Sequence, residues 1–562
     1  EPAPTLFTVV NEEVCENCGD CGAKANCMSL QKVPTEFGLK TQIHQSTCNQ
    51  DRACLGGECP SFVTVEVSPG TGVRKPARPT IQVEDLPEIE VARLAAPYHV
   101  YMPGLGGSGV LTASAILAQA AAMDGLQVKT YDQTGASQKW GAVLSSLILA
   151  PAEAPSHTNK VGIGKADLYL ALDLLAAVDT NNLKCCDAGR TRAVINSGVF
   201  PNGDVVRDSR KSLPVDELVE TVARVAREDG RVTLDARRIA EVLFGDFMMT
   251  NMVAIGAAYQ AGWLPIPADR IEAAIALNGT QVEANTQAFR AGRLWVHAPE
   301  QIAQLGTLQP RPLADRAEAL RTGGKTLALA SFELLLAKLP VKLRERVSLR
   351  ARDLADYQDT KYARRYLEQV AASARAESSA SGAGSSFAVT AAVADSLHKL
   401  MAYKDEYEVA RLLTRTGFEQ RVGAMFSGPV RLSYNLQPPF ARLLGLKGKV
   451  RVGPWVRPLL VALARFKVLR GTAVDPFGRM TSRREERALI DWYEALLRDG
   501  LALLEPGNTA LVAQLLALPM DIRGYESVKS AAVAEARQRA DALLAQLRRP
   551  RTIPIQSVPL AA

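Results

Sequence analysis

Residues 98–131 read YHVYMPGLGGSGVLTASAILAQAAAMDGLQVKTY, and this stretch decides the fold class of the central part of the chain. A short apolar run at 98–102 leads through a glycine-rich loop into an alanine-rich segment that is closed by Gly125. The apolar run predicts a strand, the segment from 110 to 123 predicts a helix, and 126–131 predicts the next strand. This order is typical of a parallel sheet covered by helices.

The pattern of the central stretch continues on its C-terminal side. Apolar runs at 142–149, 168–172 and 193–196 predict more strands, and a predicted helix at 251–261 and the segment 269–293 close the region. We therefore expect a Rossmann-like parallel sheet over residues 96–300. From about residue 310 the pattern is helical, with no series of strands. The helix-like segments are 327–339, 355–371, 388–414, 485–497 and 528–549, and the Ser/Ala/Gly-rich stretch 373–387 is expected to be a loop.

The glycine-rich loop is a candidate binding element. Its glycines are Gly104, Gly106, Gly107 and Gly109, between the predicted strand and helix. Glycines permit a tight turn and a close approach of backbone to ligand, and a helix N-terminus offers N–H groups to an anion. In a dinucleotide-binding interpretation, Asp132 would bind a ribose. The alternative is that the glycines serve only close packing of helix on sheet.

A second candidate element, TGASQKWG at 134–141, follows the next predicted strand. Open α/β sheets bind ligands at this carboxyl edge. Thr134, Gly135, Gln138 and Lys139 are therefore candidates for contact with a phosphate or a partner chain. The alternative is a solvated loop without a ligand.

Seven of the nine cysteines lie in the first 59 residues. Cys15, Cys18 and Cys21 have strict x2 spacing, which lets one loop direct three thiolates at one iron–sulfur cluster. In two-cluster ferredoxins the last cysteine of each run, often followed by proline, binds the cluster of the other run. Cys59, followed by Pro60, fits that remote position. We therefore assign a first [4Fe-4S] cluster to these four cysteines.

The remaining cysteines of the segment predict a second cluster. Cys48 and Cys54 flank Asp51 at x2 spacing on each side, so a carboxylate stands where a middle thiolate would be. Cys27 ends the first run of cysteines, so by the same exchange between runs it becomes a further ligand of the second cluster. An oxygen ligand holds iron less firmly than a thiolate, because soft ligands suit these clusters. The second cluster is thus expected to be a [4Fe-4S] cluster with Asp51 as a ligand, or a [3Fe-4S] cluster.

Zinc and disulfides are the alternatives to iron–sulfur clusters. Zinc ribbons use separated pairs of cysteines rather than three in a row. A disulfide framework is typical of short secreted chains with an even cysteine count, whereas this chain is long, has nine cysteines and shows no signal peptide. The spacing therefore favours iron–sulfur clusters and a reducing, cytoplasmic location.

Size and charge set further limits. The 562 residues predict about three to four domains, and 47% hydrophobic with 22% charged residues is ordinary for a globular protein. The sequence contains no run of 18 apolar residues, so no membrane span is indicated. The net charge of +7 is uneven, because residues 1–67 hold nine acidic and four basic residues. The basic remainder suits an acidic redox partner, an anionic cofactor or nucleic acid.

The predicted organisation has four parts, and the predicted fold class is a multidomain α/β chain. A small ferredoxin-like iron–sulfur module, with short strands expected at 35–43 and 61–67, occupies 1–67. A Pro-rich linker occupies 68–95, the sheet domain occupies 96–300, and a mainly helical domain occupies 301–562.

The serial motifs carry a family resemblance. GLGGSG, YDQTGASQKWGAV, ADLYLALDLL, VINSGVFP, NMVAIGAAYQAGWLP and IALNGTQVEANTQAFRAGR resemble the gamma domain of 2-oxoacid:ferredoxin oxidoreductases. With the cysteines ahead and the helices behind, the order is similar to the C-terminal half of fused indolepyruvate:ferredoxin oxidoreductases. The stretch at 453–497 resembles the C-terminal domain of those long enzymes. The chain starts at Glu1, so we expect a portion of a longer polypeptide or a separate subunit.

This resemblance implies oxidative decarboxylation of a 2-oxo acid such as indolepyruvate, with coenzyme A as co-substrate and ferredoxin as electron acceptor. The Gly-Asp-Gly segment that holds thiamine diphosphate and Mg²⁺ is not found in this sequence. The resemblance therefore implies a thiamine-binding partner half or subunit, and an oligomer. The alternatives are an NAD-linked iron–sulfur oxidoreductase and a zinc-bearing nucleic-acid-binding protein. The acidic cysteine segment and the low aromatic content of 6% speak against nucleic acid.

Overall fold

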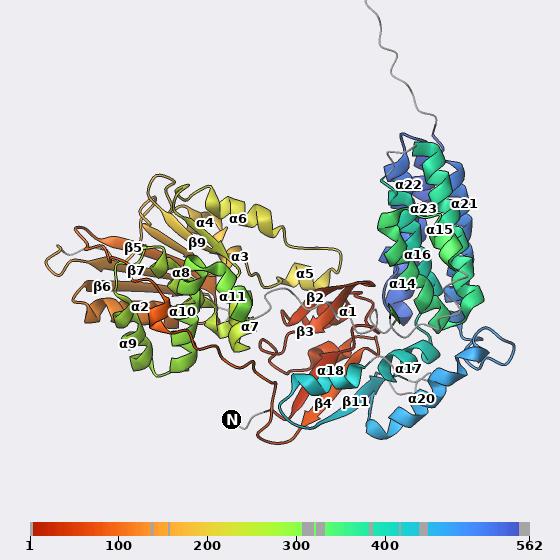
Figure 1. Ribbon diagram of the computed structural model, residues 1–562, viewed down its shortest axis with the longest axis horizontal. Helices are drawn as coiled ribbons and strands as arrows, with labels where there is room; N and C mark the ends of the chain where they lie inside the picture. Colours follow the sequence, from red (N-terminus) through yellow and green to blue (C-terminus); the bar gives the residue numbers. More distant parts are fainter. Residues whose placement is uncertain are drawn as a thin grey trace, which may run out of the picture.

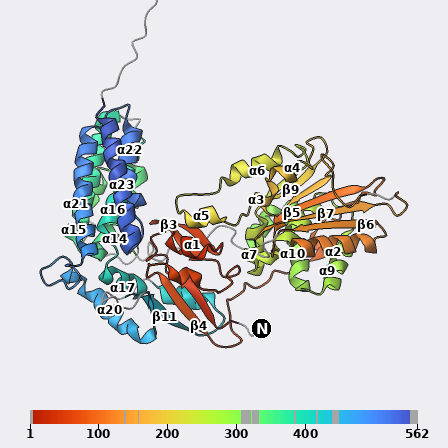
Figure 2. The same cartoon turned by 180° about the vertical axis from the view of Figure 1, so that it is seen from behind.

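The computed structural model describes residues 4–135, 140–155, 158–305, 320–321, 332–381, 386–414, 417–437 and 448–549. It has a body built around a sheet and an elongated bundle of helices, with the cysteine-bearing N-terminal segment between them (Figure 1). The reverse view shows the same arrangement (Figure 2). Lys32 Nζ donates to the carbonyl of Asp208 at 3.1 Å, and Lys404 Nζ donates to the carbonyl of Cys15 at 3.3 Å. The N-terminal segment thus contacts both bodies.

The N-terminal segment contains two antiparallel strand pairs. Its elements are β1 (Leu6–Val10), α1 (Asp20–Ala25), β2 (Leu30–Thr35), β3 (Gly38–Ile43), the short 3-10 helix η1 (Ala53–Gly56) and β4 (Phe62–Val67). β1 pairs with β4, and β2 with β3. The predicted single strand over 35–43 is therefore wrong at its start. The structure has a hairpin turn there because Gly38 adopts a φ of +92°, which only glycine adopts freely.

The sheet of β1 and β4 is completed by distant sequence. β11 (Val430–Leu436) pairs antiparallel with β4, and β12 (Val450–Val452) pairs with β11, so the order is β1-β4-β11-β12. Sequence patterns do not predict these two strands in the mainly helical region. Leu432 and Tyr434 are buried beside Val63 and Val65 in one core. The cysteine segment is therefore not self-contained, since its own sheet is continued by β11 and β12.

The central sheet has six strands in the order β10-β9-β8-β5-β7-β6. They are β5 (Tyr98–Leu105), β6 (Gln127–Thr134), β7 (Ala142–Ala150), β8 (Leu168–Ala171), β9 (Arg192–Asn196) and β10 (Arg231–Leu234). β5, β8, β9 and β10 run parallel, whereas β7 is antiparallel to both β5 and β6. The expected wholly parallel sheet is thus wrong. β6 and β7 are joined by a short loop, which permits only an antiparallel pair because parallel neighbours need a long crossover.

Helices cover both faces of this sheet. One face is packed by α2 (Val110–Met123), α7 (Ala236–Phe244), α8 (Thr250–Gln260), α9 (Ala268–Asn278) and α10 (Val282–His297). The other face packs against α3 (Leu174–Ala177) and α6 (Val215–Ala223). α8 and α10 cross so closely that a β-carbon at Gly256 would lie 1.9 Å from the carbonyl oxygen of Phe289. The remaining helices of this body are α4 (Thr180–Leu183), α5 (Gly203–Arg207) and α11 (Pro299–Leu305).

The predicted linker runs along the sheet domain. Ile81 and Leu86 are buried in its core. The amide of Ile81 donates to Gln287 at 2.7 Å, and Arg290 donates to the carbonyl of Ile81 at 3.0 Å. The segment is therefore held in place on α10 along part of its length.

The bundle is built from helices of the described C-terminal ranges whose apolar faces pack together. They are α14 (Val341–Tyr357), α15 (Thr360–Ser381), α16 (Ala388–Met401), α21 (Thr481–Ala502), α22 (Thr509–Ala517) and α23 (Glu526–Leu547) (Figure 1). Tyr366, Leu397 and Tyr493 are among its buried side chains. α17 (Glu406–Thr414) and α18 (Phe418–Met425) lead from the bundle to β11, and α20 (Arg457–Arg465) leads from β12 back to the bundle. None of the helices in the described ranges combines the length and apolarity needed to cross a bilayer.

Several expected boundaries in the helical region differ from the structure. The predicted helix 355–371 is divided between α14 and α15 at Gln358 and Asp359, and the start of the predicted helix 327–339 lies outside the described residues. The predicted helix 388–414 is divided between α16 and α17, with Tyr403 and Lys404 in the break. The expected loop at 373–387 is instead helical up to Ser381. Its Glu377 is buried, and its carboxylate accepts bonds from the amides of Val389 at 3.2 Å and Thr390 at 2.8 Å. This carboxylate caps the start of α16, so the polar stretch is stabilised as helix by its neighbour.

Candidate functional site

The cysteines of the predicted first cluster lie on two neighbouring loops. Cys15, Cys18 and Cys21 lie between β1 and the first turn of α1, and Cys59 lies shortly before β4. Cys15 Sγ accepts hydrogen bonds from the amides of Asn17 at 3.2 Å and Thr41 at 3.3 Å. Backbone donors to a sulfur of this kind stabilise its negative charge.

Three of these four cysteines, Cys15, Cys21 and Cys59, are buried in one core. Burial raises the pKa of Cys18 to about 12, and the neighbouring Cys59 and Cys15 contribute to that rise. Burial also raises the pKa of Cys21 strongly, and Cys59, Cys15 and Cys18 add to that. Thiols packed this closely do not ionise readily without a cation or metal to compensate their charge.

The remaining three cysteines of the segment belong to the same core, with Cys54 buried in it and Cys27 and Cys48 packed against it. Burial raises the pKa of Cys54 to about 12, followed by the effects of Cys48, Cys27 and Asp51. Asp51 itself is exposed, and its carboxylate accepts from the amide of Ala53 at 2.9 Å and from Asn49 Nδ2 at 3.1 Å. In this geometry Asp51 shapes the turn before η1.

The chemistry of the sulfur donors bears on the cluster prediction. All nine cysteines are free thiols, which excludes a disulfide framework in this structure. Among the described residues, no three His, Cys, Asp or Glu side chains are placed to hold one metal ion together. A cluster instead spreads its thiolate ligands over several irons. Two sets of soft sulfur donors fit iron–sulfur ligation in their chemistry, while the assignment of each ligand stays a prediction.

Of the four predicted loop glycines, Gly104 lies in β5, and Gly106, Gly107 and Gly109 lie between β5 and α2. A β-carbon on Gly104 would lie 2.5 Å from Cγ2 of Val110, so the strand and α2 could not pack as they do. Gly107 and Gly109 have φ values of +79° and +87°, which favour glycine. The amide of Gly106 donates to the carbonyl of Gly141 at 2.7 Å. Among the described residues no side chain caps α2, so the amides of its first turn remain available to an anion.

The second candidate loop lies directly beside the glycine loop. Thr134 ends β6, and Gly135 follows it, while Gln138 and Lys139 lie outside the described residues. The amide of Trp140 donates to the carbonyl of Gly106 at 3.0 Å. The structure therefore brings the two predicted loops together at the carboxyl edge of β5.

An aromatic cluster that sequence patterns do not predict lies at the same edge. The ring of Trp140 is 4.9 Å from that of Phe200 and 5.8 Å from that of Phe247, measured between centroids. Leu105 belongs to this apolar cluster, and Met28 packs against it. Met28 directly follows Cys27 in the chain. The aromatic cluster therefore lies between the loop edge of the central sheet and the second set of predicted cysteine ligands.

The dinucleotide interpretation of Asp132 is not supported by the geometry. Ser145 donates a hydrogen bond to Asp132 Oδ1 at 2.5 Å, and Ser145 Oγ lies 2.6 Å from Ser114 Oγ. β6 is separated from β5 by β7, so Asp132 does not follow the strand next to the glycine loop. Asp132 thus has a structural partner within the sheet domain.

A buried carboxyl group near the glycine loop also escapes prediction from the sequence. Asp173 follows β8, and its side chain accepts a hydrogen bond from the amide of Ala176 at 2.9 Å, capping α3. Its own amide contacts the carbonyl of Pro103 at 3.4 Å, one residue before Gly104. Burial raises the pKa of Asp173 to about 6. An aspartate directly after a predicted strand, in ALDLL, is the signal that could have found it.

Comparisons with known proteins divide the chain in the same way. Residues 99–295 match the family model described as pyruvate ferredoxin/flavodoxin oxidoreductase. Residues 343–542 match a family of unknown function, DUF6537. The indolepyruvate oxidoreductase subunit IorB of Methanothermobacter thermautotrophicus is 26% identical over 198 residues, which are 35% of this chain and 95% of that subunit. The subunit of the same name from Pyrococcus horikoshii is 27% identical over 204 residues, covering 35% and 94%.

Among solved structures, the gamma subunit of a keto/oxoacid ferredoxin oxidoreductase from Geobacter sulfurreducens is similar at 23% identity, with a TM-score of 0.26. It covers 36% of this chain and 99% of that one. The predicted resemblance to indolepyruvate oxidoreductase is thus confirmed by the named relatives. Those relatives match about a third of this chain. The oxidoreductase family model covers residues 99–295, so the cysteine segment and the bundle lie outside that family match.

Proposed function

We infer that this chain, whose residues 99–295 match the pyruvate ferredoxin/flavodoxin oxidoreductase family, is the electron-transfer and gamma-domain part of an enzyme that oxidises 2-oxo acids. The relatives named indolepyruvate oxidoreductase subunits support the general oxidoreductase role. We propose indolepyruvate or another arylpyruvate as substrate and coenzyme A as co-substrate. The products are an acyl-CoA and CO₂, and ferredoxin accepts the electrons.

One observation carries this proposal. A single chain combines the oxidoreductase-matching sheet domain with a buried core that gathers cysteines of both predicted sets, and Met28, next to Cys27, packs against the aromatic cluster of that domain. Electron transfer between two centres requires that little solvent and little distance separate them. Met28, which follows Cys27 in the chain, packs against the apolar cluster of Trp140 and Phe200 at the loop edge.

The ligand roles follow from the cysteine sets. We propose that Cys15, Cys18, Cys21 and Cys59 hold one [4Fe-4S] cluster in a ferredoxin-like module. Cys27, Cys48 and Cys54 would hold the second, with Asp51 nearest to its fourth position. When bound, the clusters supply one-electron carriers. The chain itself contributes buried sulfur donors and the amides of Asn17 and Thr41, which bond to Cys15.

We propose that the two adjoining loops at the carboxyl edge of β5 face the thiamine-binding half of the enzyme. The glycines Gly104, Gly106, Gly107 and Gly109 place no side chain at this edge, and the uncapped start of α2 suits an anion such as a phosphate of coenzyme A. Thr134, Gly135, Gln138 and Lys139 would complete the contact. Thiamine diphosphate and its Mg²⁺ would be bound by that other half, and the complete enzyme would be an oligomer.

The proposal is tested by joining this chain with its thiamine-binding half under anaerobic conditions. Arylpyruvate should then reduce methyl viologen in a reaction that requires thiamine diphosphate and coenzyme A. The matched control omits this chain and should lose the reduction. Intact clusters without reduction by any 2-oxo acid would contradict the proposed function.

A further inference from the structure

Basic side chains of residues 343–542, the region matched by the family of unknown function, contact the loop that contains Cys15 and Cys18. Lys404 Nζ donates to the carbonyl of Cys15 at 3.3 Å and forms an ion pair with Glu16. From the module itself, Lys40 Nζ donates to the same carbonyl at 2.9 Å. Two ammonium groups therefore converge on the backbone of the first predicted ligand.

The start of α23 and the turn before it cover the same loop. Tyr525 donates through its hydroxyl to the carbonyl of Val14 at 2.7 Å, and its ring packs against the core that contains the cysteines. Arg523 donates to the carbonyl of Asn17 at 3.4 Å. This side of the cysteine module is thus covered by residues more than 500 positions away in the sequence.

Lys449 approaches the cysteine segment at Phe62, which is buried in one core with Cys21, Cys54 and Cys59. Its Nζ is buried, has no hydrogen-bond partner in the described part of the chain, and lies 4.9 Å from the ring centroid of Phe62. Burial lowers the pKa of Lys449, while Cys59, Cys21 and Cys54 oppose that lowering. A buried ammonium group without a hydrogen-bond partner among the described residues needs a negative charge nearby to offset its desolvation.

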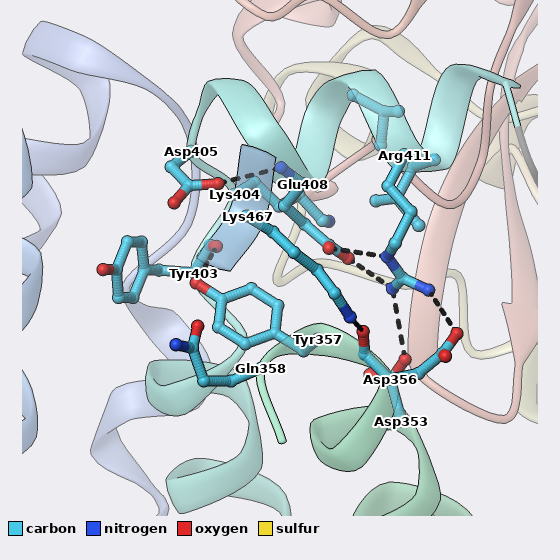
Figure 3. Close-up of polar contacts among 12 residues, drawn as sticks. Asp353, Asp356, Tyr357, Gln358, Tyr403, Lys404, Asp405, Glu408, Arg411 and Lys467 are labelled. Atoms are coloured by element: carbon cyan, nitrogen blue, oxygen red, sulfur yellow. Dashed lines mark hydrogen bonds and ion pairs between the residues drawn. The ribbon is translucent and has the colours of Figure 1, made fainter. Parts of the chain in front are cut away.

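A buried polar network fixes the backbone that carries Lys404 (Figure 3). The next residue, Asp405, accepts from the amide of Glu408 at 2.8 Å and also binds Arg470 through both carboxylate oxygens. Glu408 in turn pairs with Arg411 at 2.7 Å, and Arg411 reaches Asp353 of α14 at 3.4 Å. The position of Lys404 is therefore set by the helix bundle rather than by the cysteine module.

We propose that this helical region of unknown function completes the pocket of the proposed iron–sulfur clusters, and that its cations Lys449 and Lys404 raise their reduction potential. The inference rests on the proposed function. Reduction adds a negative charge to a cluster, and a buried positive charge nearby stabilises the reduced form. Glu16 offsets part of the charge of Lys404, so Lys449 should have the larger effect.

The test is an anaerobic redox titration of the whole chain, followed by electron paramagnetic resonance (EPR). Lys449→Gln removes the charge, Lys449→Arg retains it, and Lys160→Gln removes an exposed charge from the sheet domain as a matched control. For Lys449→Gln we expect the equilibrium to shift about tenfold toward the oxidised cluster, which is about 59 mV for one electron. The other two variants should titrate as the unmodified chain does.

The outcomes separate this inference from the function on which it rests. An unchanged potential in iron-replete Lys449→Gln would overturn the tuning role and leave the proposed function intact. If that variant loses iron, Lys404→Gln provides the same measurement, and a potential equal to that of the unmodified chain would overturn the inference. An unmodified chain without iron and sulfide would overturn the proposed function and the inference together.

Discussion

A β-carbon on Gly524 would lie 3.3 Å from the β-carbon of Cys18, so the turn before α23 rests directly on a predicted cluster ligand. Gly524 has a φ of +104°, a conformation that L-residues rarely adopt. The added carbon would also meet Cγ1 of Val528 at 2.7 Å. Backbone conformation and close packing thus both require glycine at this junction of bundle and cysteine module.

Gly524→Ala should therefore destabilise the chain by about 1–3 kcal/mol and loosen the first cluster. Gly262→Ala is the control, because Gly262 has a φ of +75° but nothing within 4 Å of its added carbon. Denaturant unfolding and iron retention measure the two effects. Equal iron loss in both variants would show that contact with Cys18 has no special role.

Arg411→Met should destabilise the bundle by about 3–5 kcal/mol, because it leaves buried carboxylates without this partner. Arg411 is buried and contacts Glu408 and Asp353. Arg365→Met is the control, because Arg365 pairs with Glu494 but is more exposed than Arg411. It should lower the free energy of unfolding by no more than about 1 kcal/mol. A similar loss in thermal unfolding for both variants would contradict this account of the network in Figure 3.

Asp173 predicts a pH dependence of stability. Its pKa of about 6 in the folded protein lies above the ordinary value of 3.8, so the native state holds the proton more tightly. The contribution of Asp173 to the free energy of unfolding is fully present below about pH 4. It is lost as the pH rises from there through about 6, a decrease of about 3 kcal/mol. Asp173→Asn keeps a cap for α3 and should remove that decline in unfolding measured from about pH 4 to 7. An identical decline in the variant would show that Asp173 is not its source.

Trp140→Leu should slow electron transfer without loss of iron from the clusters. The substitution removes the ring that contacts Phe200 and Phe247 at the loop edge. With the thiamine-binding half present, we expect viologen reduction to fall about tenfold or more while iron content stays constant. Trp295→Leu on α10 is the matched control and should leave the rate near that of the unmodified chain. Equal rates in the two variants would exclude the aromatic contact from electron transfer.

Asp51→Cys tests the second cluster. If Asp51 occupies or adjoins its fourth position, a thiolate there should convert a labile or three-iron centre into a stable four-iron centre. EPR before and after reduction measures the change. An unchanged spectrum would mean that Asp51 only shapes its turn, as its bond to the amide of Ala53 suggests.

Local patterns predict the elements that depend on neighbouring residues. The strand, glycine loop and helix at 98–123 occur as expected, because the apolar runs and the turn glycines act within a few residues. The antiparallel direction of β7 is not predictable in this way, since strand direction depends on pairing rather than on composition. β11 escapes prediction because its partner, β4, is more than 350 residues away in the sequence.

The candidate site shows the same limit. Regular spacing in the sequence is enough to single out the cysteines and glycines, whereas Trp140, Phe200 and Phe247 are single aromatic residues on separate segments. Lys449 is an ordinary lysine in sequence, and only the fold brings it against Phe62, in the core that contains Cys54 and Cys59. Residues that act through long-range packing carry no local signal.

The measurement that tests the central claim most directly is the iron, acid-labile sulfide and zinc content of the anaerobically purified chain, with EPR before and after reduction. The account predicts a brown protein with about seven to eight irons and matching sulfide, and signals from two clusters after reduction. A colourless protein that contains zinc and no sulfide would contradict it.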